Sequence, residues 1–177
     1  MIVSSPHSQT DLEIAVGMDP GSRISGIGIV GAAHGRVHHI AHFPIKIPEK
    51  LTQAEKLLFF AKEFQKILES HPDATLVIES LFTAKNVSSI LKVSHFRGVA
   101  MMMAARNDWK VVEVSPATVK VNVTGYGRAT KEQVQFMVQK LLRLKEPPMP
   151  LDCSDALAMA ICHLGQSKLQ KRIKQIV

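Results

Sequence analysis

The sequence predicts an α/β fold in which a five-stranded mixed sheet is flanked by helices. Three apolar runs follow one another closely, separated only by turns, which is typical of an antiparallel meander. Two later apolar runs alternate with segments of helical periodicity, which predicts parallel strands joined by right-handed crossovers. The predicted strands cover residues 12–18, 26–32, 36–45, 74–79 and 111–114.

Each helix is predicted from its periodicity and its boundary residues. Leu57, Ala61 and Phe64 belong to a helical repeat over 51–70, which His71-Pro72-Asp73 ends. A longer apolar segment predicts a helix over 84–107. A Ser-Pro start predicts a short helix over 115–123, and the capping-box pair Thr130 and Gln133 predicts one running to 144. The last helix, 156–164, follows the breaker at 147–150.

Length and composition favour one domain. A chain of 177 residues with 46% apolar residues can bury one core. We place the domain at 12–165, with an N-terminal extension at 1–11 and a basic C-terminal tail at 166–177.

No stretch is apolar enough to span a membrane, and the first residues lack an export pattern. Cys153 and Cys162 lie on one predicted helix, roughly 13 Å apart, too far for a bridge. A reduced, cytoplasmic protein is expected.

Positive charge is concentrated in the middle of the chain. The net charge is +7, and residues 85–145 hold eleven basic against three acidic residues. Such a segment suits a polyanionic partner, although lysines that merely solvate helix faces give the same composition. The acidic residues decide between these interpretations.

Four carboxylates occupy positions that indicate a shared site. Asp19 and Glu79 each end an apolar strand, and Asp152 and Asp155 lie three residues apart near the start of the last helix, on one face. Taken singly, Asp19 suits a turn, Asp152 an N-cap and Asp155 a dipole partner. Glu79, at the end of a buried strand, has no comparable structural role. Together the four predict a divalent-metal site for phosphodiester cleavage, with magnesium as two ions about 3.5 to 4 Å apart.

Several blocks of the chain resemble the RuvC family of bacterial Holliday-junction resolvases, in order and from about residue 14 to 164. The blocks are Gly17-Met18-Asp19-Pro20-Gly21-Ser22-Arg23 with Gly26 and Gly28, Val77-Ile78-Glu79-Ser80-Leu81-Phe82, Ala84-Lys85-Asn86, Arg97-Gly98-Val99-Ala100 and Asp152-Cys153-Ser154-Asp155-Ala156-Leu157-Ala158-Met159-Ala160. The resemblance implies a ribonuclease-H-like fold and a homodimer that uses magnesium or manganese to cut two strands of a four-way DNA junction in recombination and repair. It also implies RuvA and RuvB as branch-migration partners.

The resemblance assigns roles to individual residues. Its catalytic acids match Asp19, Glu79, Asp152 and Asp155, and two lysines, Lys120 and Lys131, match positions for binding or catalysis at the scissile strand. Phe82 matches an aromatic residue that stacks on a junction base, which competes with a simple core role. Arg23, Lys85 and Arg128 are candidate phosphate contacts. The apolar part of the helix over 84–107 is the candidate dimer contact.

Three alternatives remain from the sequence alone. A YqgF-like RNA nuclease shares the first strand and turn, but Glu79 followed by Phe82 and the pair Asp152 and Asp155 weigh against it. A junction-binding protein that does not cut would show no metal-dependent nicking. A nucleotide-binding module is disfavoured because the chain lacks Gly-x-x-x-x-Gly-Lys-Ser/Thr.

Overall fold

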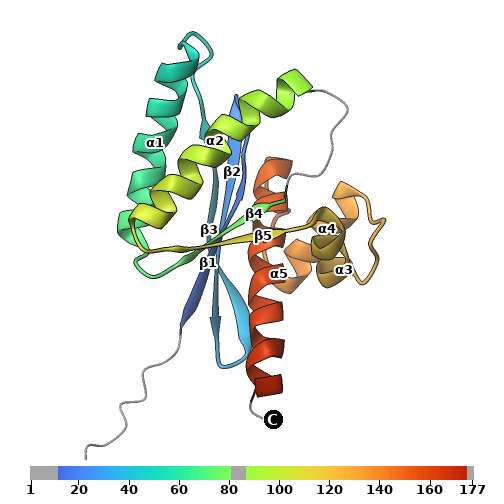
Figure 1. Ribbon diagram of the computed structural model, residues 1–177. Helices are drawn as coiled ribbons and strands as arrows, with labels where there is room; N and C mark the ends of the chain where they lie inside the picture. The colour runs from blue at the N-terminus through green and yellow to red at the C-terminus, as the bar shows by residue number, and fades with distance from the viewer. Residues whose placement is uncertain (1–11, 81–86, 175–177) are drawn as a thin grey trace, which may run out of the picture.

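The computed structural model describes residues 12–80 and 87–174, and a mixed sheet of five strands lies at its centre. Helices cover both faces of this sheet (Figure 1). The elements in chain order are β1 (Glu13–Asp19), β2 (Ile24–Ala33), β3 (Arg36–Lys46), α1 (Gln53–Ser70), β4 (Thr75–Glu79), α2 (Val87–Arg106), β5 (Lys110–Val114), α3 (Pro116–Thr124), α4 (Lys131–Leu141) and α5 (Leu151–Lys174).

The strand order is β3-β2-β1-β4-β5. Strands β1, β2 and β3 form the predicted antiparallel meander, while β4 pairs parallel to β1 and β5 parallel to β4. The predicted fold class is therefore confirmed. Parallel pairing has a functional consequence, because it brings the carboxyl ends of β1 and β4 to the same edge of the sheet.

The sheet separates two apolar cores. Helices α1 and α2 cover one face, and α3, α4 and α5 cover the other (Figure 1). Side chains alternate along β1 as the pleat requires: Val16 and Met18 join the core under α1 and α2, and Ala15 joins the core under α5.

Glycines on the sheet allow α5 to lie unusually close to it. A Cβ atom on Gly17 would overlap the backbone of Ala156, and one on Gly26 would overlap the backbone of Asp152. Because Gly26 pairs with Asp19 across β1 and β2, this contact brings the first turn of α5 beside the end of β1. These two glycines therefore help to determine where the acidic residues of α5 lie.

The predicted boundaries of two helices are wrong. Helix α4 ends at Leu141 rather than at 144, and Arg143 in the following turn has a positive φ, which a helix cannot continue through. Helix α5 begins at Leu151, directly after the proline, so Asp152 and Asp155 lie inside it rather than before it. It also continues to Lys174, so the segment predicted as a basic tail starts within this helix.

Further predictions concern the membrane and the cysteines. Within the part of the chain that the structure describes, no helix has the length and apolar character needed to span a membrane. Cys153 and Cys162 are buried free thiols, as the prediction of no bridge between them requires. Burial raises the pKa of each thiol to about 11, so both are protonated at neutral pH.

Candidate active site

The predicted acidic residues meet at the carboxyl edge of the central strands. Asp19 is the last residue of β1 and Glu79 the last of β4, and their preceding residues, Met18 and Ile78, are paired in register. Asp155 reaches the same place from α5. Residues far apart in the sequence thus converge because two parallel strands end together and one helix begins beside them.

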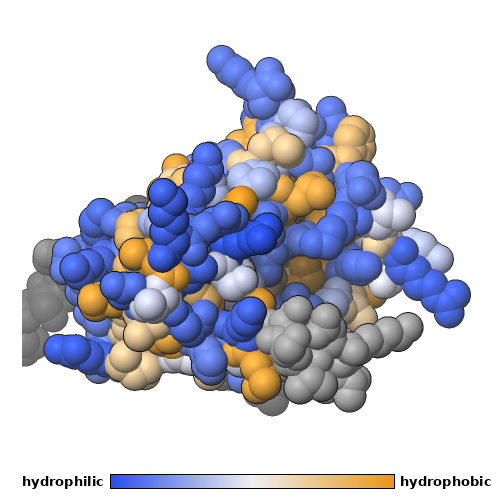
Figure 2. All heavy atoms as spheres, turned by 90° about the horizontal axis from the view of Figure 1, so that it is seen from above, coloured by the Kyte–Doolittle hydropathy of each residue, from blue (hydrophilic) through white to orange (hydrophobic). Residues whose placement is uncertain are grey.

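A cavity of about 250 Å³ opens at this edge. Its charged lining consists of three carboxylates and two lysines, and its remaining walls are apolar. The lining residues are Asp19, Glu79, Pro116, Val119, Lys120, Lys131, Val134, Asp155 and Met159. Figure 2 looks onto the end of the molecule where α5 begins and shows hydrophilic side chains around more deeply set hydrophobic ones. The cavity therefore presents opposite charges on an apolar base.

Lys131 and Asp155 form an ion pair inside this cavity. The Lys131 Nζ atom lies 2.6 Å from the Asp155 Oδ2 atom. Lys131 is the first residue of α4, and the capping box of Thr130 and Gln133 sets the start of that helix. The hydrogen bond to Asp155 raises the pKa of Lys131, so this amine stays protonated at neutral pH.

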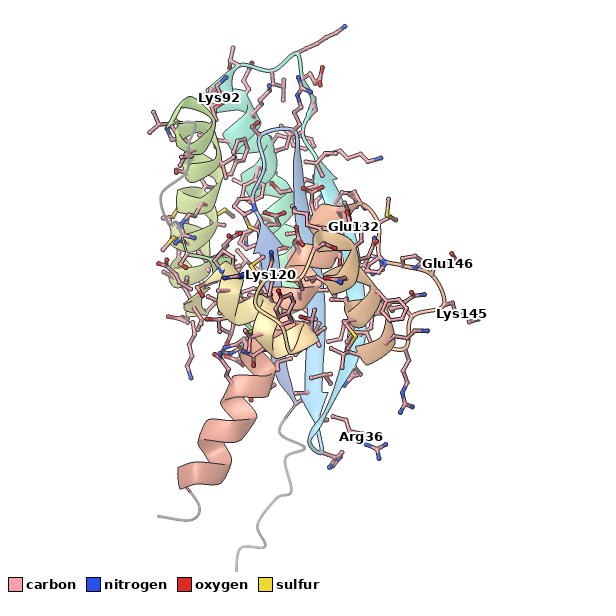
Figure 3. The ribbon with its side chains drawn as sticks, turned by 90° about the vertical axis from the view of Figure 1, so that its right-hand side faces the viewer. Arg36, Lys92, Lys120, Glu132, Lys145 and Glu146 are labelled. Atoms are coloured by element: carbon pink, nitrogen blue, oxygen red, sulfur yellow. The ribbon has the colours of Figure 1, made fainter. Side chains whose placement is uncertain are left out.

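Lys120 enters from α3, whose position beside α4 and α5 is visible in Figure 3. Its side chain is half-buried and lines the same cavity. Partial desolvation of the Glu79 carboxylate against the cavity wall and the charge of Asp155 raise the pKa of Glu79, and the positive charges of Lys131 and Lys120 lower it in part. The two lysines predicted from the sequence are therefore close enough to act on the acidic residues electrostatically.

Asp19 is the most perturbed acid of the site. Burial raises the pKa of Asp19 from 3.8 to about 7, and the charges of Asp155 and Asp152 add to this effect. Lys131 lowers it only in part. Asp152 does not line the cavity but acts on Asp19 through its charge. The site therefore concentrates negative charge that its own lysines do not fully compensate.

The arrangement provides oxygen donors for a hard divalent cation such as magnesium. A bound cation would neutralise the negative charge that the lysines leave uncompensated. The carboxylate oxygens are also the type of ligand that magnesium prefers. Within residues 12–80 and 87–174, however, no three acidic, histidine or cysteine side chains are already gathered as a closed ligand set.

The remaining predicted contacts lie elsewhere. Arg23 is exposed after β1, where its guanidinium lies 3.5 Å from Glu49, and Arg128 is exposed in the loop before α4. Neither lines the cavity. Phe82 and Lys85 fall outside the described residues, so their roles stay predictions.

Two residues of the site have no assigned role in the sequence-based prediction. Gly26 permits the close approach of Asp152, and Arg97 donates a hydrogen bond to the backbone carbonyl of Glu79. Arg97 stands in one of the family-like blocks, which was the available signal, but its contact with Glu79 spans two elements and is not visible in the sequence.

A larger cavity, about 660 Å³, lies at the opposite end of the sheet. It is lined by residues at the starts of β1, β4 and β5, including Glu13, Thr75 and Lys110, and by His163 of α5. The size of this cavity does not make it the active site. The carboxylates that raise one another's pKa, Asp19, Glu79 and Asp155, lie at the opposite edge of the sheet.

The fold and its acidic edge define a ribonuclease-H-like protein. The sequence model of the family described as crossover junction endodeoxyribonuclease RuvC matches residues 15–163. This chain belongs to the RuvC family.

The relatives cover most of the chain. RuvC of Alkaliphilus oremlandii is 41% identical over 161 residues, which span 91% of this chain and 98% of that protein. RuvC of Thermotoga maritima is 40% identical over 156 residues, 88% of this chain and 93% of that protein. The solved structure of Thermus thermophilus RuvC in complex with a Holliday junction substrate has a TM-score of 0.83 and 27% identity, covering 89% of this chain and 96% of that chain.

Proposed function

We infer that this protein is an endodeoxyribonuclease that resolves four-way (Holliday) DNA junctions by paired, symmetric nicking in homologous recombination and DNA repair. The observation that carries this inference is the cavity in which Asp19, Glu79 and Asp155 face Lys120 and Lys131. Membership of the RuvC family and the similarity to the Thermus thermophilus protein bound to a junction support it.

The chemistry depends on a divalent cation, as is typical of RuvC-family nucleases. We propose magnesium, with manganese as a substitute, and two ions per site held by Asp19, Glu79, Asp152 and Asp155. When bound, the cations lower the pKa of the attacking water and stabilise charge on the leaving 3′ oxygen. The raised pKa of Asp19 supports this assignment, because the buried cluster has charge that a cation would neutralise.

The two lysines prepare the site for a phosphate. Lys131 holds Asp155 through the 2.6 Å ion pair and keeps its positive charge at neutral pH. Lys120 projects into the same cavity from α3 and can donate to a phosphate oxygen. A compact ammonium group stabilises negative charge that develops on the phosphate during cleavage. The same ion pair fixes the direction of the Asp155 carboxylate within the cavity.

The surrounding surface supplies the remaining DNA contacts. We propose that the basic segment 85–145 binds the phosphate backbone, with Arg23 and Arg128 as exposed contacts. Lys85 is assigned the same role, and Phe82 is assigned base stacking, on the family resemblance alone.

A homodimer would place two such sites on the two related strands of a junction. On α2, Leu91 is 57% exposed and Met102 56%, and eleven residues of helix return them to nearly the same face. Leu58 on neighbouring α1 is also 57% exposed. We propose that these apolar side chains belong to the dimer contact, and that RuvA and RuvB are partners as the family resemblance implies.

One assay distinguishes the candidate functions. The purified chain is incubated with a labelled four-way junction, a linear duplex of the same sequence and a stem-loop RNA, each with magnesium or with EDTA. Paired nicks restricted to the junction and dependent on magnesium are the expected result. Cleavage of the RNA instead would favour the YqgF-like alternative, and junction binding without nicks would favour a non-cutting protein.

The matched variants are Asp155→Asn and Glu146→Gln. Glu146 is exposed on the loop between α4 and α5, at the periphery in Figure 3, so its replacement removes a charge outside the cavity. Asp155→Asn is expected to abolish cutting and to leave junction binding unchanged or tighter, because a ligand and a negative charge facing the phosphate are both lost. Glu146→Gln is expected to cut normally. Loss of junction binding in Asp155→Asn would contradict the assigned role.

A further inference from the structure

Arg97 is a buried cation of α2 that contacts the active-site strand. It is 7% exposed, and its guanidinium uses two nitrogen atoms for two different partners. Nη1 donates to the backbone carbonyl of Glu79 at 2.6 Å, and Nη2 lies 2.6 Å from Oε2 of Glu113 on β5. A buried guanidinium is costly unless it is paired in this way, so both contacts define its position.

The backbone at the end of β4 is held from two directions. On one side, the amide and the hydroxyl of Ser80 both donate to the carbonyl oxygen of Val114 on β5, at 2.9 and 3.2 Å. On the other side, Arg97 holds the carbonyl of Glu79 from α2. The Glu79 side chain itself is exposed and lines the cavity. Its direction is therefore determined by how the backbone is anchored more than by side-chain packing.

We propose that Arg97 is a positioning residue for the metal site: it acts through the Glu79 backbone to aim the Glu79 carboxylate at the cation, and Glu113 holds Arg97 in place. The proposal rests on the proposed function in one respect, namely that Glu79 is a ligand of the cation. It adds a residue that touches neither cation nor DNA but determines the affinity of the site.

The guanidinium chemistry explains why an arginine stands here. Its planar group presents several donors in a fixed arrangement, so one side chain reaches a carbonyl on β4 and a carboxylate on β5 together. A lysine ammonium is a compact charge on a flexible chain, so it would fix the Glu79 carbonyl less firmly than the guanidinium does. Arg97→Lys should therefore restore part of the function, whereas Arg97→Gln should not.

The test measures binding of Mn²⁺ alone to the full chain, by calorimetry and by loss of the free Mn²⁺ signal in electron paramagnetic resonance. Loss of a residue that orients a metal ligand typically lowers affinity by about 10- to 100-fold, and we expect about tenfold or more for Arg97→Gln. Arg97→Lys and Glu113→Gln should each lose less. Thermal unfolding of the same samples in EDTA records the loss of stability separately.

A core variant controls for destabilisation. Phe64 of α1 is fully buried in the core between α1, α2 and the sheet, and Phe64→Leu removes packing from that core without removing a hydrogen bond. It should unfold at lower temperature but bind Mn²⁺ within about twofold of the wild type, because packing is lost only on the α1 and α2 face, while the contacts that anchor Glu79 and the packing of α5 are unchanged. Equal loss of Mn²⁺ affinity in Phe64→Leu, or wild-type affinity in Arg97→Gln, would overturn the proposal. If Arg97→Gln does not fold, Arg97→Lys and Glu113→Gln decide it by the same comparison.

Junction cutting by the wild type separates this proposal from the proposed function. If the wild type binds Mn²⁺ and Arg97→Gln does not, but the wild type cuts no junction, the positioning role stands and the assigned reaction is wrong. If the wild type cuts junctions and Arg97→Gln binds Mn²⁺ normally, the reaction stands and the positioning role is wrong. Absence of Mn²⁺ binding by the wild type would overturn the positioning role, because the Glu79 carboxylate would then have no cation to bind.

Discussion

Asp19→Asn is expected to make the metal-free protein more stable at pH 8, although the same change abolishes cutting. The folded-state pKa of Asp19, about 7, lies above the value of 3.8 for a free side chain, chiefly because of burial. The folded protein therefore retains this proton to higher pH than the unfolded chain does. Between about pH 4 and about pH 7 the unfolded chain has already released this proton and the folded protein has not. The free energy of unfolding therefore falls as the pH rises through this range.

The size of the effect follows from the shift. About 3 pH units correspond to at most about 4 kcal/mol in the free energy of unfolding. Part of the shift comes from Asp155, Asp152 and Glu79, and protons redistribute among coupled acids when one charge is removed. We therefore expect Asp19→Asn to recover about 1 to 2 kcal/mol at pH 8. For a chain of this size that is a rise of about 2 to 8 °C in Tm.

Thermal and denaturant unfolding in EDTA between pH 4 and pH 8 measures this difference. The stability of Asp19→Asn relative to the wild type should be close to zero at pH 4 and reach its full value near pH 8. Magnesium should narrow the gap, because it stabilises the wild-type carboxylates and has fewer ligands in the variant. Glu146→Gln, which removes an exposed charge, should show no such pH-dependent gain. A variant less stable than the wild type at pH 8 in EDTA would refute the reasoning.

Three further outcomes are expected. Gly26→Ala should lose about 1 to 3 kcal/mol of stability in denaturant unfolding and also lose cutting, because its Cβ would meet the backbone of Asp152, whereas Gly165→Ala on α5, with open space around it, should lose neither. Junction affinity measured by fluorescence anisotropy should fall steeply between low and physiological salt, through counterion release from the basic segment, and a flat profile would exclude that surface as the DNA footprint. Purified mixed dimers with one Asp19→Asn subunit should nick one strand; resolution of both strands, with subunit exchange ruled out, would contradict the dimer proposal.

The secondary structure was largely predictable because its signals are local. The unbroken apolar run before Glu79 indicates a strand buried on both faces, and β4 lies between β1 and β5. The Thr130 and Gln133 pair is a real capping box. The start of α5 was misplaced because the apolar repeat begins later than the helix does. The helix starts directly after Pro150, and the polar residues of its first turn concealed it.

The sequence predicted which residues belong to the site and that two of them end strands. It did not predict which side chains of the site contact one another. Asp19 and Glu79 end parallel neighbouring strands, which makes their convergence a consequence of topology. The ion pair of Lys131 with Asp155 joins residues 24 apart on two helices, and the hydrogen bond of Arg97 to Glu79 joins residues 18 apart. Such contacts depend on how helices pack on the sheet, and a single sequence has no local pattern that records them.

The same packing explains how the acidic residues are held close to one another despite their like charges. Asp152 and Asp155 both raise the pKa of Asp19 through charge repulsion, so electrostatics alone would separate α5 from β1. The opposing contribution comes from the apolar core under α5 and from Gly26, which lets the backbone of Asp152 lie against β2. The stability of this core is therefore used in part to hold like charges near one another, and a bound cation relieves the repulsion that the core otherwise opposes. Cation affinity and the packing of α5 should consequently change together, so weakening the helix–sheet contact should weaken metal binding even where no ligand is altered.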